Sequence, residues 1–169
     1  MKTRTLIALL ALFAFIACEK HPYKKEDRAI EKLIAQCQNF SEATLLEKLP
    51  GKWKTYCDLV YNSSWSAIEE TPLYMGQTDL CGGGWPIRTF TVDGTVSIYY
   101  NTWGSWDGVT YTYDWNYDSN SKKLTLTSRE GLNDEEYNVK GISNEYLILD
   151  YYDTTNNHNR REILKRIAE

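Results

Sequence analysis

The chain has two histidines, the side chain best suited to general acid–base chemistry near neutral pH. His21 lies in a polar N-terminal stretch and His158 lies among asparagines, and neither follows or precedes a plausible serine or cysteine nucleophile. We expect the glutamate pairs at 69–70 and 135–136 to be solvent-exposed surface residues rather than a catalytic pair. The sequence therefore predicts no catalytic residue, no metal site and no cofactor, and we expect a protein that is not an enzyme.

Cysteine is the second residue type that could carry chemistry here. Cys37, Cys57 and Cys81 do not show the Cys-x-x-Cys spacing typical of a zinc site. In an oxidising compartment they could form one disulfide and leave one thiol, with three alternative pairings. Of these we favour Cys57–Cys81, which would join the first strand to a long loop.

The N-terminal segment has the pattern of an export signal. Lys2 and Arg4 precede an apolar run over 6–17. This run is shorter than the roughly 20 residues needed to span a bilayer, and it matches the apolar region of a secretory signal. It ends in Phe-Ile-Ala and then Cys18, which resembles the lipobox of bacterial lipoproteins.

The lipobox resemblance implies a membrane anchor. Residues 1–17 would be cleaved, Cys18 would become the lipidated N-terminus, and 18–25 would form a polar tether. It further implies a protein of the bacterial cell envelope, with the outer membrane as the expected membrane partner. The alternative is ordinary secretory cleavage near Ala17, with Cys18 left as a thiol.

Composition restricts the class of fold and of partner. The formal net charge is −4, and without a basic patch we expect no nucleic-acid partner. The chain has 13 tyrosines and six tryptophans, which favours a β-rich domain with amphipathic aromatic faces. The length after the signal fits one domain with its own core, and we expect a monomer.

Hydrophobic periodicity predicts two short helices followed by strands only. Apolar residues recur at helical spacing over 26–38, and Ser41 can cap a second helix that Pro50 and Gly51 end. We assign 26–48 to a helical lead-in and 49–169 to the β-domain. The expected strands are 52–61, 87–92, 95–101, 110–117, 123–129, 135–140, 145–152 and 160–167.

The clearest hairpin surrounds the Asp-Gly pair at 93–94. A two-residue loop would place apolar residues of the two strands on opposite faces. A three-residue loop with Gly94 in the left-handed conformation instead pairs Phe90 with Val96 on one face, and we prefer it.

Alternation assigns inward faces to two further strands. A four-residue turn over 118–121 would set Trp115 opposite Leu124. In the opening strand, alternation places Trp53, Thr55, Cys57 and Leu59 on one face.

Gly51-Lys52-Trp53, followed by eight strands in hairpin order, resembles the Gly-x-Trp opening of lipocalins. The layout is also similar to the lipocalin-like domains of bacterial envelope lipoproteins, whose Thr-Phe-x-x-Asp-Gly-Thr hairpin is matched over 89–95. The resemblance implies an all-β, eight-stranded antiparallel up-and-down barrel with a short N-terminal helical lead-in; a two-sheet sandwich is the alternative. It also implies that Trp53 closes one end beneath an arginine of the last strand, Arg161 or Arg166.

Two functional hypotheses follow. In the first, the barrel binds a small apolar or amphipathic ligand, with Tyr100, Tyr113 and Trp115 lining or filling the interior. In the second, a surface module binds glycan or a partner protein through tryptophans in polar loops. The loop tryptophans expected at such a site are Trp65, Trp85, Trp103 and Trp106.

Overall fold

The computed structural model describes residues 31–61, 73–74, 86–100 and 108–168. Cys18, Cys81 and the loop tryptophans predicted to bind ligand lie outside these ranges, as do the predicted signal segment and tether. The strands are β1 (Gly51–Tyr61), β2 (Leu73–Tyr74), β3 (Ile87–Phe90), β4 (Thr95–Tyr100), β5 (Val109–Asp118), β6 (Lys123–Ser128), β7 (Glu135–Ile142), β8 (Tyr146–Asp153) and β9 (His158–Arg166).

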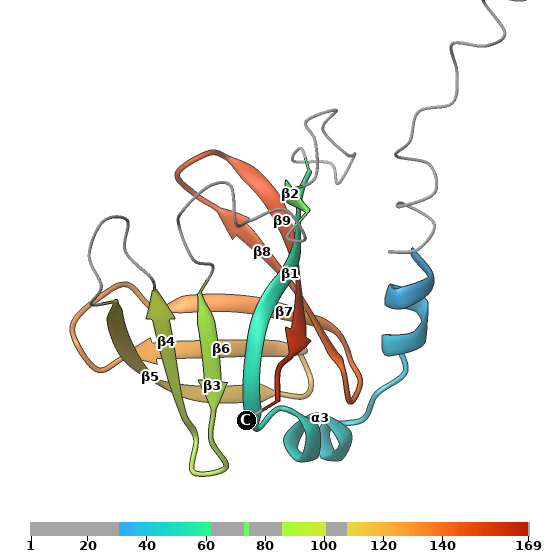
Figure 1. Cartoon of the computed structure of the whole chain (residues 1–169), viewed down its shortest axis with the longest axis horizontal. Helices are drawn as coiled ribbons and strands as arrows, with labels where there is room; N and C mark the ends of the chain where they lie inside the picture. The colour runs from blue at the N-terminus through green and yellow to red at the C-terminus, as the bar shows by residue number, and fades with distance from the viewer. Residues whose placement is uncertain (1–30, 62–72, 75–85, 101–107, 169) are drawn as a thin grey trace, which may run out of the picture. The chain divides into compact units, whose positions relative to one another are not determined.

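The strands form a closed antiparallel barrel, which confirms the predicted fold class (Figure 1). Each strand from β3 to β9 pairs with the next in the chain, and β1 pairs with both β3 and β9. The closing ladder runs from Trp53 opposite Arg166 to Tyr61 opposite Asn159. Eight strands in this order make a lipocalin-like up-and-down barrel rather than a two-sheet sandwich. The short β2, which the sequence did not predict, pairs with β1 at Cys57 and Asp58.

Two short helices precede the barrel within the described part of the chain. One covers 31–37, and α3 (Glu42–Lys48) begins after Ser41, whose Oγ accepts a hydrogen bond from the Thr44 amide at 3.1 Å, as the capping prediction expected. Chain contacts divide the protein into two compact units, 1–35 and 36–169, and the barrel and α3 belong to the second. No helix within the described ranges is long and apolar enough to cross a membrane.

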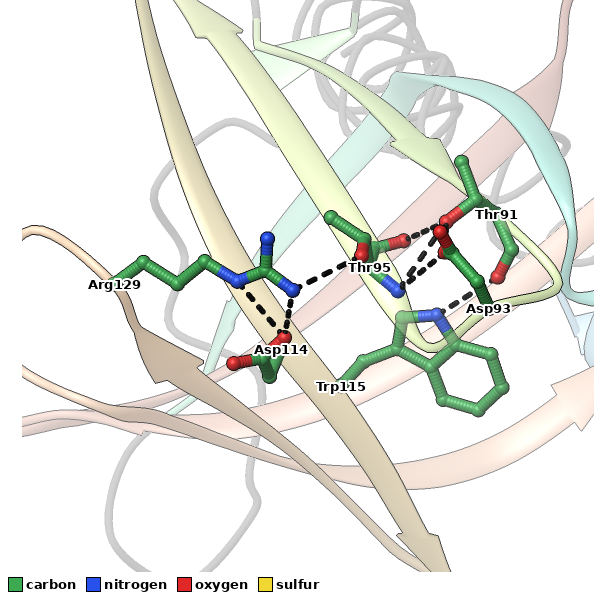
Figure 2. A network of polar contacts seen from close by, with 6 residues as sticks. All are labelled: Thr91, Asp93, Thr95, Asp114, Trp115 and Arg129. Atoms are coloured by element: carbon green, nitrogen blue, oxygen red, sulfur yellow. Dashed lines mark hydrogen bonds and ion pairs between the residues drawn. The ribbon is translucent and has the colours of Figure 1, made fainter.

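The β3–β4 hairpin has the predicted three-residue loop. Phe90 pairs with Val96, and Gly94 has a φ of +87°. Polar contacts hold this loop to the neighbouring strand β5: the Trp115 Nε1 donates to the Thr91 carbonyl at 3.1 Å. Figure 2 shows the whole network, formed by Thr91, Asp93, Thr95, Asp114, Trp115 and Arg129.

The predicted register of the β5–β6 hairpin is wrong by two residues. Trp115 pairs with Leu126 and Tyr117 with Leu124, because the turn lies one residue later than expected. Asp118 accepts a hydrogen bond from the Asn120 amide at 3.0 Å, and Lys122 takes up the positive φ of 56°. A shift of two leaves every side chain on its predicted face, so the core is unaffected.

The predicted face of β1 is correct only as far as Thr55. A bulge between Thr55 and Cys57 changes the register against β9, so that Asp58 rather than Cys57 turns into the barrel. Cys57 is paired with Ile163 and is buried on the outer side of the sheet. Its predicted pairing with Cys81 stays a prediction, since Cys81 lies outside the described ranges.

Candidate functional site

One end of the barrel is closed by the side chain of Trp53. The indole is fully buried, and its Nε1 donates to the Leu49 carbonyl at 2.8 Å. The Arg166 guanidinium lies 4.1 Å from the centroid of the indole ring and donates to the carbonyl oxygens of Pro50 and Asn144, each at 2.8 Å.

Gly51 makes this approach sterically feasible. It has a φ of +133°, and a Cβ at this position would lie 2.1 Å from Arg166 Nη1. Of the two arginines expected near Trp53, Arg166 therefore takes that position. Arg161 instead pairs with the buried Asp150, with Nε to Oδ1 at 2.7 Å.

Above Trp53 the interior is filled by apolar side chains. They come from every strand of the barrel, because alternate residues of a strand point inward. The buried cluster includes Phe90, Val96, Ile98, Leu124, Leu126, Leu147, Leu149 and Leu164. This half of the barrel is solid core.

The other half holds a cavity of about 500 Å³. It lies where β1 and β8 end and where β3, β7 and β9 begin, opposite Trp53 and α3. The sequence did not decide whether side chains fill the barrel interior. In the described part of the barrel, side chains fill one end and the cavity occupies the other. The described lining residues are Asp58, Pro86, Arg88, Tyr100, Asp134, Glu135, Glu136, Tyr137, Tyr151, Tyr152, Asp153, Thr154, Arg160 and Glu162.

The floor of the cavity is a buried ion pair. Arg88 Nη1 lies 2.9 Å from Glu162 Oε1, and each side chain is only 6% exposed. Glu162 Oε1 also accepts a hydrogen bond from the Thr55 hydroxyl. Burial by itself would lower the pKa of Arg88, but the Glu162 carboxylate raises it well above its ordinary value, so Arg88 is charged.

A second ion pair stands beside the first. Arg160 bonds to Asp58 and also reaches Asp153 Oδ2 at 3.1 Å. Burial raises the pKa of Asp58, and the hydrogen bond and charge of Arg160 oppose that rise. Asp58 can form this ion pair with Arg160 only because the β1 bulge turns its side chain into the barrel.

Tyrosines form the aromatic wall. The rings of Tyr137 and Tyr151 meet edge to face with centroids 5.4 Å apart, and Tyr100 packs in the same way on Tyr111 at 5.8 Å. The guanidinium of Arg88 lies 6.0 Å from the Tyr137 ring centroid. Arg160 lies at the same distance from the Tyr151 ring. The arginines thus contact both carboxylates and ring faces.

Alkaline pH should destabilise the barrel through these rings. Burial raises the pKa of Tyr113 to about 12 and also raises the pKa of Tyr137 and Tyr151. Above pH 10 the unfolded chain ionises at these residues while the folded chain stays protonated, so the free energy of unfolding falls. The expected slope is about 1.4 kcal/mol per pH unit for each such tyrosine, until the folded pKa is reached. Denaturant titrations at several pH values, with phenolate absorbance, measure it.

Tyr151→Phe is the matched variant for this measurement. It should show a shallower loss of stability above pH 10 than the wild-type chain. Ionisation of Tyr137 and Tyr151 while the barrel is still folded, at the pH of a free tyrosine, would contradict the prediction.

Of the three expected ligand residues that lie within the described ranges, Tyr100 alone is on the cavity wall. Tyr113 is 3% exposed and belongs to the apolar core. Trp115 lies beside the β3–β4 hairpin (Figure 2). Its ring packs on that of Phe90, with centroids 6.3 Å apart. Trp85, Trp103 and Trp106 lie outside the described ranges, so their expected role stays a prediction.

The charged floor of the cavity was not predicted from the sequence. Strand alternation contained a signal for part of it: Arg88 lies two residues before the inward Phe90, and Glu162 two residues before the inward Leu164. Nothing in the local sequence pointed to Asp58, which faces inward only because of the bulge.

Comparisons with known proteins report a likeness to solved structures. No protein-family model and no curated protein matches the sequence. Among solved structures, the chain is similar to japanin from Rhipicephalus appendiculatus, solved bound to cholesterol. The TM-score is 0.42 at 12% sequence identity, over 69% of this chain and 74% of that chain. The fold assignment above comes from the strand order and the β1–β9 pairing.

Proposed function

We propose that this barrel binds a small amphipathic molecule in the mouth cavity and releases it chemically unchanged. The observation that carries the proposal is the change of lining along the barrel, from solid apolar core to tyrosines and paired charges around about 500 Å³. That volume lies within the roughly 300–1,000 Å³ typical of ligand sites. The polar lining favours an amphipathic ligand over a wholly apolar one. A wholly apolar ligand would displace water from the charged side chains and would offer them no hydrogen bond in its place.

Native mass spectrometry of the full chain, purified from the cells that make it, tests this proposal. The wild-type protein should retain a small molecule, and Tyr100→Ala should retain at least roughly tenfold less, because it removes a cavity wall. Tyr99→Ala is the matched control, since Tyr99 is adjacent on β4 but faces outward.

Equal retention by Tyr100→Ala and Tyr99→Ala would place the molecule elsewhere on the protein. A bare intact mass for the wild-type chain, together with no binding of added small molecules, would overturn the proposal.

We also propose that the protein is held at the bacterial cell envelope by acyl chains on Cys18, most naturally at the outer membrane. The support is the N-terminal sequence: a basic start, an apolar run over 6–17, and a small residue directly before Cys18. The intact mass from the same experiment checks this. A chain that begins at an unmodified Cys18, or that keeps residues 1–17, would contradict it.

A further inference from the structure

The inference concerns the charge of the ligand, and it rests on the proposed function. Six carboxylates and two arginines are among the described residues that line the cavity, a formal charge of −4. Lys123, which is not among these lining residues, lies 2.9 Å from Glu136 Oε2 and offsets one of the carboxylates. The cavity therefore has a net negative charge that the described side chains around it do not balance.

Two of the lining carboxylates have no cation partner among the described residues. Both arginines of the lining already pair with other carboxylates of the protein. Asp134 and Glu135 instead meet neutral donors: Asp134 Oδ1 accepts from the Ser128 amide at 3.0 Å, and Glu135 accepts from the Tyr137 hydroxyl. The three internal segments outside the described ranges contain no lysine, arginine or histidine, so none of them can supply the missing cation.

The charge of Glu135 is directed into the barrel. Glu135 pairs across β6 and β7 with Leu126, a fully buried core residue, and it lies two residues before the buried Tyr137 on the same strand. Alternate residues of a strand share a face, so Glu135 is on the inner face. The glutamate pair at 135–136 was expected at the surface, which is correct only for Glu136, whose side chain is 61% exposed.

The aromatic wall gives separate evidence for a cation. The rings of Tyr137 and Tyr151 each have an arginine guanidinium 6.0 Å from the centroid. The ring of Tyr100, on the same wall, has no such cation partner among the described residues. Burial raises the pKa of Tyr100 and the negative charge of Glu135 raises it further, so this carboxylate acts on the wall at Tyr100.

An organic ammonium ion meets both conditions. Its N–H groups can donate to the Glu135 carboxylate, and its charge is attracted to the face of the Tyr100 ring. A carboxylate or phosphate would be repelled by the negative lining, and a neutral molecule would displace water from Glu135 without replacing the lost charge interaction. We propose that the cavity binds a small organic cation, whose ammonium group pairs with Glu135 beside the Tyr100 ring.

A bare metal ion fits this lining less well. A hard cation such as Ca²⁺ needs about six to eight oxygen ligands that converge on one point. Within the described ranges, no three His, Cys, Asp or Glu side chains lie close enough together to hold a metal ion. An organic cation needs no such convergence, since its charge can be shared between one carboxylate and an aromatic ring.

Ligand-observed NMR titration of the full chain tests this with three probes of similar shape. At about pH 7 phenethylamine is cationic, phenylethanol is its neutral analogue and phenylpropanoate is its anionic analogue. We expect phenethylamine to bind at least about tenfold more tightly than phenylethanol, and phenylpropanoate to bind most weakly. Calcium chloride at matched ionic strength is the fourth probe, and it should not displace phenethylamine.

Glu135→Gln is the decisive variant, because it removes the charge and keeps an acceptor for the Tyr137 hydroxyl. It should weaken phenethylamine binding by about tenfold or more and leave phenylethanol binding unchanged. Glu145→Gln is the matched control, since Glu145 is exposed beside Arg166 at the closed end of the barrel, and it should bind as wild type does. Should Glu135→Gln fail to fold, about 0.5 M salt should weaken wild-type binding of phenethylamine and not of phenylethanol.

The outcomes separate this inference from the proposed function. Preferred binding of phenylethanol, phenylpropanoate or calcium, or a retained molecule without a positive charge, overturns the inference of a cation and leaves the proposed function to its own test. Phenethylamine binding that is unaffected by Glu135→Gln, or by salt where that variant does not fold, also overturns it. No probe binding together with a bare native mass overturns both. A retained cationic molecule would support both and would identify the amine.

Discussion

Trp53→Ala should lower the free energy of unfolding by about 3–5 kcal/mol, the range for truncating a fully buried tryptophan. Three contributions are lost together: the packing of the indole against the core, the bond from Nε1 to the Leu49 carbonyl, and the contact of the ring with Arg166 at 4.1 Å. The carbonyl of Leu49 also loses its donor at a buried position. Urea denaturation followed by far-UV circular dichroism measures the change.

Trp115→Ala is the matched control for this prediction. Trp115 is only half-buried and lies at the β3–β4 hairpin, so its loss should cost clearly less. Trp53→Phe should fall between the two, since it keeps an aromatic ring and removes the N–H donor. A loss below about 1 kcal/mol for Trp53→Ala would mean that the closed end does not stabilise the barrel.

Arg88→Met should destabilise the barrel by about 3–5 kcal/mol, because removing one partner of a buried ion pair leaves the other charge uncompensated. Among the described residues, Glu162 would keep only the Thr55 hydroxyl as a partner, at a position where its side chain is 6% exposed. The double variant Arg88→Met, Glu162→Leu removes both charges and should recover most of that loss. Urea denaturation of the wild-type, single and double variants gives the coupling energy of the pair.

The double variant also separates stability from function. If the pair serves the site, the double variant should fold with near-wild-type stability and still fail to retain the cavity ligand. A double variant as unstable as Arg88→Met alone would show that the pair stabilises the fold itself. The prediction favours the first result, since apolar replacements of similar volume often match a buried pair in stability.

Local sequence rules predicted the fold well because strands that follow one another in the chain are also neighbours in the barrel. Hairpin-order strands need only short-range signals: period-two alternation, turn residues and loop parity. Phe90 pairs with Val96 as the loop parity predicted. The same rules missed the register at Trp115 by two residues, because a turn can move along the chain without changing which side chains point inward.

The candidate site was far less predictable. Among the predicted ligand residues that the structure describes, only Tyr100 lies on the cavity wall, while Tyr113 belongs to the apolar core. Aromatic residues read from sequence do not reveal their depth in the barrel, since core and cavity wall share the same alternation. Depth is set by how the strands are staggered around the closed sheet.

The sequence by itself determined the order of the eight barrel strands, the hairpin at Gly94 and the cap at Ser41, because each depends on residues within a few positions of one another. Only the tertiary structure decided the rest. Closure of β1 on β9 brings Thr55, Arg88 and Glu162 together, with 107 and 74 positions between the bonded residues. The β1 bulge turns Asp58 inward toward Arg160, 102 positions away. Contacts over such separations follow from strand register around the whole barrel, which no local pattern contains.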